Sequence, residues 1–293
     1  MMQQFSLLLN TPHLISALAA VIGLLVGSFL NVVIYRLPIM MQRNWRRECA
    51  EYLQISSEAM QPEEEPFNLV FPLSRCPNCN TPIKPYQNIP VISYVLLKGK
   101  CATCSNPISL RYPIIEVFTA ITSAIVAWHF GYTPQTVFAL ALTWSLIALS
   151  VIDIDHQLLP DSITLPVLWL GMCLSLFSLF TDTHSSIIGA ISGYIALWLV
   201  YHLFKLATGK EGMGYGDFKL LALFGAWLGW QYLPAIILLS SLVGAVIGLT
   251  MIIVVKRDHT IPIPFGPYLA AAGWIALLWG NDINQLYLTT AGL

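Results

Sequence analysis

Two aspartates stand where apolar runs meet polar connections, and their side chains could together perform acid–base chemistry. Asp153 begins the polar connection 153–162, and Asp217 ends the glycine-rich connection 207–217. Ionisable groups near hydrocarbon are costly, so they are functional candidates by default. Two carboxylates that share a site do not both ionise easily, so one stays protonated while the other accepts a proton from water. Such a pair could activate water for attack on a peptide carbonyl.

Helix capping is the competing interpretation of the same aspartates, because a single Gly-x-Gly-Asp motif is a weak signal. On these residues alone both interpretations stay open. Asp161 precedes Ser162 and an apolar run, and we expect it to cap a helix. His156 lacks nearby partners in the sequence, and we expect it to be a polar loop residue.

Four cysteines form two Cys-x-x-Cys pairs separated by 21 residues, which is the spacing of a zinc ribbon. Each pair offers two thiolates, and together they complete a closed tetrahedral shell without an open position for catalysis. The sequence therefore predicts one structural Zn²⁺ per chain, and free thiols or disulfides are the alternatives. Cys49 and Cys173 have no partner at metal spacing. The predicted ligands are Cys76, Cys79, Cys101 and Cys104.

The elements that position these groups are apolar runs of membrane-spanning length. Hydrophobic residues make up 56% of the 293 residues and charged residues only 10%, whereas about a quarter of a soluble domain is charged. We therefore predict an all-α polytopic membrane protein with about eight transmembrane helices. The expected runs are 14–35, 113–131, 135–152, 163–181, 185–206, 218–231, 232–255 and 264–280.

The positions of the basic residues predict how the chain is oriented in the membrane. Nine of the fourteen lie between the first two runs, and with eight spans and an outside N-terminus all fourteen fall at or near the cytoplasmic side. We expect an N-terminal anchor helix over 1–35. This segment does not resemble a cleaved signal peptide, because residues 1–13 contain no Lys or Arg and the charged start of a signal peptide is therefore missing. A small cytoplasmic zinc-ribbon-like domain follows over 36–112, and a membrane peptidase domain over 113–293.

Taken in order, the motifs of this chain resemble those of the type IV prepilin peptidases, which are bifunctional leader peptidases and N-methyltransferases of the Gly-x-Gly-Asp membrane aspartic peptidase class. The resemblance covers nearly the whole chain. The matching pieces are Gly27–Pro38, the two Cys-x-x-Cys pairs, Arg111–Glu116, Asp153 with Leu159-Pro160-Asp161, Lys210–Lys219 and Pro262–Pro267.

The resemblance implies that Asp153 and Asp217 are the catalytic pair, since Asp153 holds the family's Asp-(x)6-Pro spacing to Pro160 and Asp155 does not. It implies cleavage of the basic leader of prepilins and pseudopilins, after Gly and usually before Phe. The new N-terminus is then methylated with S-adenosyl-L-methionine. The expected partners are these substrates and the lipid bilayer of the bacterial inner membrane, with the active site facing the cytoplasm; no nucleic acid is expected.

Two other functions could use similar residues. Intramembrane carboxylates also suit the proton relays of transporters, but the inverted repeats typical of many transporters are not evident. A zinc protease would need a His-Glu-x-x-His motif, which is missing. Asn31 and Glu116, at the edges of spans, could line the substrate path, bind the cofactor or bridge helices. The sequence carries no glycine-rich fingerprint for the methyl donor.

Overall fold

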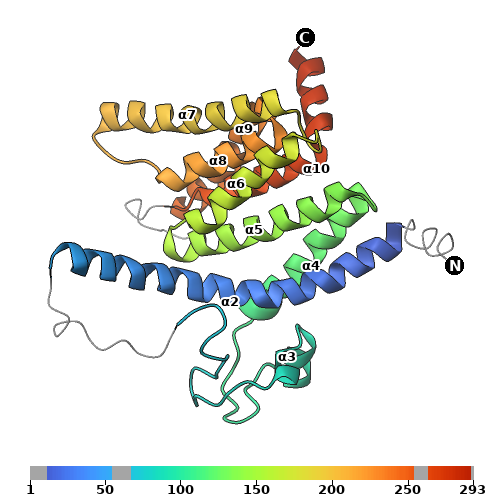
Figure 1. Cartoon of the computed structure of the whole chain (residues 1–293), viewed down its shortest axis with the longest axis vertical. Coiled ribbons are helices and arrows are strands. Elements are labelled where there is room, and N and C mark those ends of the chain that lie inside the picture. The colour runs from blue at the N-terminus through green and yellow to red at the C-terminus, as the bar shows by residue number, and fades with distance from the viewer. Residues whose placement is uncertain (1–11, 55–66, 254–262, 292–293) are drawn as a thin grey trace. The chain divides into compact units, whose positions relative to one another are not determined.

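The structure, a computed structural model, describes residues 12–54, 67–253 and 263–291. The start of the predicted anchor, residues 1–11, lies outside this part of the chain. Within the described ranges the regular structure is helical, and β pairing is limited to two isolated bridges, Arg75–Pro82 and Lys100–Pro107. The chain forms two compact units, Met1–Tyr132 and Thr133–Leu293 (Figure 1).

The first unit is built on two helices, α2 (Pro12–Tyr52) and α4 (Arg111–Phe130). They approach closely because α2 presents Gly23 and Gly27: a Cβ at Gly27 would lie 2.8 Å from the Cα of Glu116. Small residues allow such close packing of helices in membranes. Between the two helices lie the short η1 (Pro85–Asn88) and α3 (Ile92–Leu96).

Helix α2 continues well beyond residue 35, where the sequence predicted the anchor to end. Pro38 lies inside it, and the helix extends to Tyr52. The predicted boundary between anchor and cytoplasmic domain therefore falls within one helix, and the three-domain division itself stays a prediction.

The second unit is arranged around α8 (Tyr215–Leu228), which is buried on nearly all sides. Neighbouring α7 (Thr183–Thr208) packs closely against it through glycines: Gly189 faces Gly225 of α8, and a Cβ at Gly193 would lie 2.8 Å from the carbonyl oxygen of Leu221. The remaining helices of this unit are α5 (Pro134–His156), α6 (Asp161–Ser175), η2 (Trp230–Tyr232), α9 (Leu233–Ile253) and α10 (Gly266–Ala291).

Every predicted apolar run overlaps a helix in the described residues, but the bounds and the lengths differ: the run 163–181 continues beyond the end of α6 at Ser175. Five stretches in the described ranges are long and apolar enough to cross a bilayer: α2, α4, α5, α7 and Trp230–Met251. Helix α6 has 15 residues and α8 has 14, fewer than the roughly 20 that a lipid-facing span needs. The prediction of a helical protein with several candidate membrane spans is confirmed for the described residues, whereas the number of eight spans stays a prediction.

Candidate active site and metal centre

Asp153 lies in the last turn of α5, and its side chain points into the protein. Only 6% of the residue is exposed. Its Oδ2 accepts a hydrogen bond of 3.0 Å from the backbone N–H of Gly266, the first residue of α10. The N-terminus of a helix favours negative charge, so α10 both orients and stabilises this carboxylate.

Asp217 lies in the first turn of α8 and is equally buried, with 6% exposed. Its side chain is close enough to Asp153 for the two carboxyl groups to repel each other electrostatically. The structure therefore brings together the two aspartates that lie 64 positions apart in the sequence.

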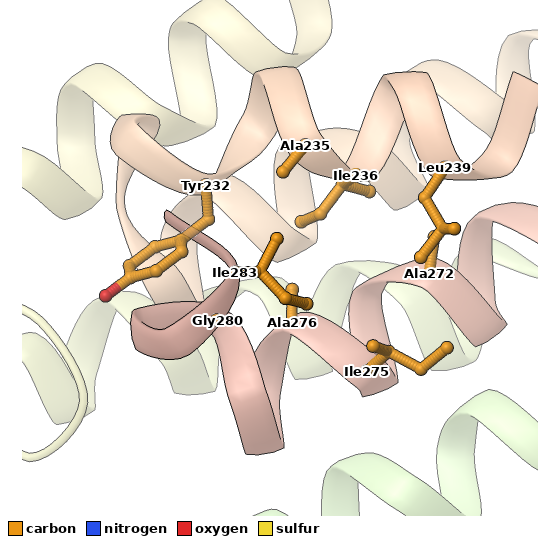
Figure 2. A pocket seen from close by; sticks show the side chains of 9 residues that line it. All are labelled: Tyr232, Ala235, Ile236, Leu239, Ala272, Ile275, Ala276, Gly280 and Ile283. Carbon is orange, nitrogen blue, oxygen red and sulfur yellow. The ribbon is translucent and has the colours of Figure 1, made fainter. Parts of the chain in front are cut away.

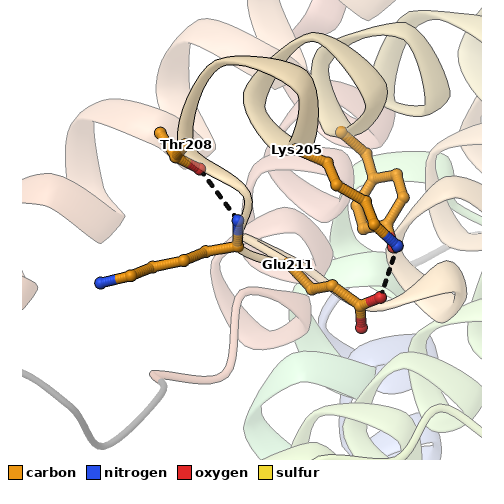
Figure 3. Close-up of polar contacts among 5 residues, drawn as sticks. Lys205, Thr208 and Glu211 are labelled. Carbon is orange, nitrogen blue, oxygen red and sulfur yellow. Dashed lines mark hydrogen bonds and ion pairs between the residues drawn. The ribbon is translucent and has the colours of Figure 1, made fainter.

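The loop that leads to Asp217 is fastened by an ion pair (Figure 3). Lys205 at the end of α7 contacts Glu211 at 2.8 Å, and this hydrogen bond lowers the pKa of the Glu211 carboxyl below its usual range. The backbone N–H of Lys210 also donates to the hydroxyl of Thr208. These two contacts tie the start of the glycine-rich connection to the C-terminal end of α7.

Leu159 packs over the glycines next to both aspartates. A Cβ at Gly216 would lie 2.7 Å from the Cβ of Leu159, and one at Gly266 would lie 3.2 Å from its Cδ2. A Cβ at Gly216 would therefore clash with this leucine, whereas one at Gly266 would only crowd it. The role of Gly266 was not predicted from the sequence, although its place in the motif Pro262–Pro267 was a usable signal.

The other polar residues of the 153–162 connection lie outside this buried pair. Asp155 and His156 are exposed. Asp161 does not cap α6, so that prediction is wrong: it is the first residue of the helix, and its carboxylate instead binds Lys219 of α8 at 2.7 Å. The Asp161 carboxylate thus pairs with a lysine distant in the sequence and makes no capping hydrogen bond to the backbone of α6.

The four predicted metal ligands gather in the first unit. Their Sγ atoms all lie within 4.8 Å of one another. Cys76 and Cys104 are 3.8 Å apart, and Cys79 and Cys101 are 4.0 Å apart. A tetrahedral site with Zn–S bonds of about 2.3 Å requires sulfur separations of about 3.8 Å, so the cluster fits one such ion.

Each cysteine pair sits in the same kind of turn. Cys76 N–H donates to Thr81 and Cys101 N–H to Asn106, and the turn residues Asn80 and Ser105 both have φ of 57°. Hydrogen bonds with Thr81 lower the pKa of the Cys79 thiol to about 6, which favours the thiolate that binds metal. The repeated pattern Cys-x-x-Cys-x-x-Pro-Ile encodes both turns.

Asn31 and Glu116 are buried at the contact of α2 with α4. The amide of Asn31 donates to the carbonyl oxygens of Gly27 and Tyr112, so it bridges the two helices. Glu116 accepts a 2.7 Å hydrogen bond from the backbone N–H of Val91 and another from Ser28. These contacts favour a bridging role for both residues.

An apolar pocket between α9 and α10 has a different character (Figure 2). Ile236 and Leu239 of α9 face Ala272, Ala276 and Ile283 of α10 across it. Neither aspartate lines it, and Tyr232 is the one titratable residue among those that line it.

Comparisons with known proteins match both parts of the chain. Residues 21–130 match the bacterial peptidase A24 N-terminal domain, and residues 140–249 match the type IV leader peptidase family. A prepilin leader peptidase/N-methyltransferase of Stutzerimonas stutzeri is 56% identical over 98% of both chains. A protein of the same name from Pseudomonas aeruginosa is 56% identical over 92% of both chains. One from Legionella pneumophila is 44% identical over 97% of this chain and 98% of its own. No solved structure gives a significant match.

Proposed function

The chain belongs to the type IV leader peptidase family, and from this membership we propose that its buried aspartate pair cleaves the leader peptide from prepilins and pseudopilins. The observation that carries the proposal is that Asp153 and Asp217, from separate helix ends, share one buried location in the half of the chain that matches the peptidase family. The same enzyme then methylates the new N-terminal residue.

The pair divides the work of hydrolysis between its two members. Because the carboxyl groups repel each other, one holds a proton and the other is a carboxylate. The carboxylate takes a proton from water while the water oxygen attacks the scissile carbonyl carbon. The protonated partner donates to the carbonyl oxygen. When the tetrahedral intermediate collapses, the C–N bond breaks, the leaving amine receives the proton that the first aspartate took from water, and the second aspartate takes back a proton from a hydroxyl of the intermediate. Gly266 holds one oxygen of Asp153 in place throughout.

Methyl transfer uses a separate place in the chain. It needs an uncharged amine aligned with a sulfonium methyl, and proximity provides much of the rate. We propose that the 67–111 segment and the adjoining membrane boundary help to bind S-adenosyl-L-methionine. Support comes from the match of the first unit to an N-terminal domain distinct from the peptidase family. The zinc held by Cys76, Cys79, Cys101 and Cys104 would stabilise this segment and take no part in the reaction.

The distribution of basic residues supports a proposal for the orientation. We propose that the enzyme lies in the bacterial inner membrane with the N-terminus outside and eight spans. Under this arrangement, the ends of α5, α8 and α10 that carry Asp153, Asp217 and Gly266 all face the cytoplasm. The basic leader of a prepilin lies on that side, next to the apolar segment that follows it.

One mass measurement tests the proposed function. The purified enzyme is incubated with a full-length prepilin and S-adenosyl-L-methionine, and the pilin product is analysed by mass spectrometry. We expect a product that lacks the leader and carries one N-terminal methyl group. An intact prepilin, or a product cut at another peptide bond, would contradict the proposal.

A further inference from the structure

We propose that α3 and its flanking residues form a membrane-surface anchor that binds an anionic lipid leaflet, with Ile92, Val95 and Leu96 inserted among the lipids. The inference concerns how the cysteine-bearing segment is held at the bilayer, and it stands independently of the proposed reaction. It rests on the depth, the exposure and the charge of this segment.

The depth of α3 follows from its contacts with the two long helices. The N–H of Val91, directly before α3, donates to Glu116 in the second turn of α4. Glu116 also bonds Ser28 of α2. Arg36, the first basic residue after the apolar part of α2, lies eight residues beyond Ser28. At 1.5 Å per residue, α3 therefore begins about 12 Å closer to the bilayer centre than the backbone of Arg36.

The position of α3 is held by specific contacts. Val91 has φ of 57°, a conformation that β-branched residues rarely adopt. Its hydrogen bond to the buried Glu116 carboxylate offsets this local strain. In Figure 1, α3 lies level with the body of α2 rather than beyond its C-terminal end.

At this depth α3 presents apolar side chains outward. The exposed fractions of Ile92, Val95 and Leu96 are 56%, 66% and 76%. Tyr86 and Tyr112 are also exposed nearby in the sequence, and tyrosines are enriched where membrane proteins cross the lipid–water interface. An apolar surface at the level of a membrane-spanning helix meets lipid, whereas the same surface in water would be costly.

The charge of the segment selects the kind of lipid. Residues 67–111 contain no Asp or Glu. The segment stays net positive even when four thiolates hold one zinc ion. Basic residues beside an inserted apolar element are attracted to anionic headgroups. The five basic residues are Arg75, Lys84, Lys98, Lys100 and Arg111.

Fluorescence quenching by labelled lipids tests the anchor. The exposed Cys49 and Cys173 are replaced by serine, and Leu96→Cys is labelled with a fluorophore in the zinc-loaded full chain. Tyr52→Cys, at the exposed end of α2, is the matched control. In nanodiscs with doxyl-labelled lipids, we expect the label at 96 to be quenched several-fold more strongly than the label at 52.

Two outcomes would overturn the anchor. Equal quenching at 96 and 52, together with quenching of 96 by aqueous iodide, would place α3 in water. Protection of 96 from both quenchers would show that protein covers α3, from another part of this chain or from a second copy.

A second variant tests the role of charge. Lipid quenching at 96 should increase when anionic phosphatidylglycerol replaces part of the phosphatidylcholine. Lys98→Gln combined with Lys100→Gln should reduce that increase and leave quenching in pure phosphatidylcholine unchanged. An undiminished increase in this double variant would contradict a headgroup contact by these lysines.

Discussion

Asp153 depends on a glycine that lies 113 residues further along the chain, because the amide of Gly266 binds its Oδ2. The local sequence around Asp153 contains no trace of this contact. The aspartates themselves could be predicted from their place at the ends of apolar runs and from the family motifs. Their shared burial and the help from α10 depend on tertiary packing, which local patterns do not encode. The predicted cap at Asp161 was wrong for the same reason, since Lys219 is 58 residues away.

Replacing Gly266 with alanine should displace Asp153. The added Cβ would lie 2.6 Å from Oδ2 of Asp153 and 3.2 Å from Leu159. Because small misplacements of reacting groups are costly, we expect leader cleavage to slow about 100-fold. The control is Gly248→Ala, whose Cβ would make an ordinary 3.4 Å contact with Ile263. Equal cleavage rates for the two variants, measured by gel assay of a prepilin, would contradict this role of Gly266.

The cysteine cluster was the most predictable site, because the two Cys-x-x-Cys turns are local and their spacing is specific. We expect about one equivalent of zinc per purified chain. Replacing Cys76 and Cys104 with serine removes one ligand from each turn and should abolish binding. Cys49→Ser with Cys173→Ser is the matched control and should retain the metal. Full zinc content in the first double variant, measured by elemental analysis, would remove the basis of the assignment.

At the scale of helices, apolar runs predicted where each element lies but not how much lipid it meets. Helix α8 is short, yet it is surrounded by α6, α7 and α10, so its length need not match the bilayer. Burial of this kind depends on the neighbours that surround a helix, and a hydropathy pattern does not report them. The extension of α2 to Tyr52 likewise escaped prediction, because residues 36–52 are too polar to read as a span.

The contact between α7 and α8 should be sensitive to a single methyl group. A Cβ at Gly225 would overlap the backbone carbonyl of Gly189. Backbone atoms cannot rotate away, so Gly225→Ala must separate the helices. We expect a loss of about 2 kcal/mol of stability, as for overpacked cores. Thermal unfolding in detergent measures it, with Gly248→Ala as the reference. An unchanged melting temperature for Gly225→Ala would show that the two helices are less closely packed than described.

At the scale of the whole molecule, the resemblance drawn from the motifs is confirmed by the family matches and by relatives over nearly the full length. Each of these motifs is a weak signal by itself. Their combination in one fixed order along the chain was sufficient to identify the family. The two compact units also correspond to the two matched families. This division is the physical basis for expecting cleavage and methyl transfer to be separable.

The most direct measurement compares four purified variants with prepilin and with pre-cleaved pilin bearing a free N-terminal Phe, in the presence of labelled S-adenosyl-L-methionine. We predict that Asp153→Asn and Asp217→Asn each lose leader cleavage but still methylate pre-cleaved pilin, which also shows that they are folded. The exposed-site controls Asp155→Asn and Asp161→Asn should retain substantial cleavage. Cleavage by Asp153→Asn or Asp217→Asn at the wild-type rate would contradict the catalytic pair, and loss of methylation in every folded variant of the pair would contradict two separate sites.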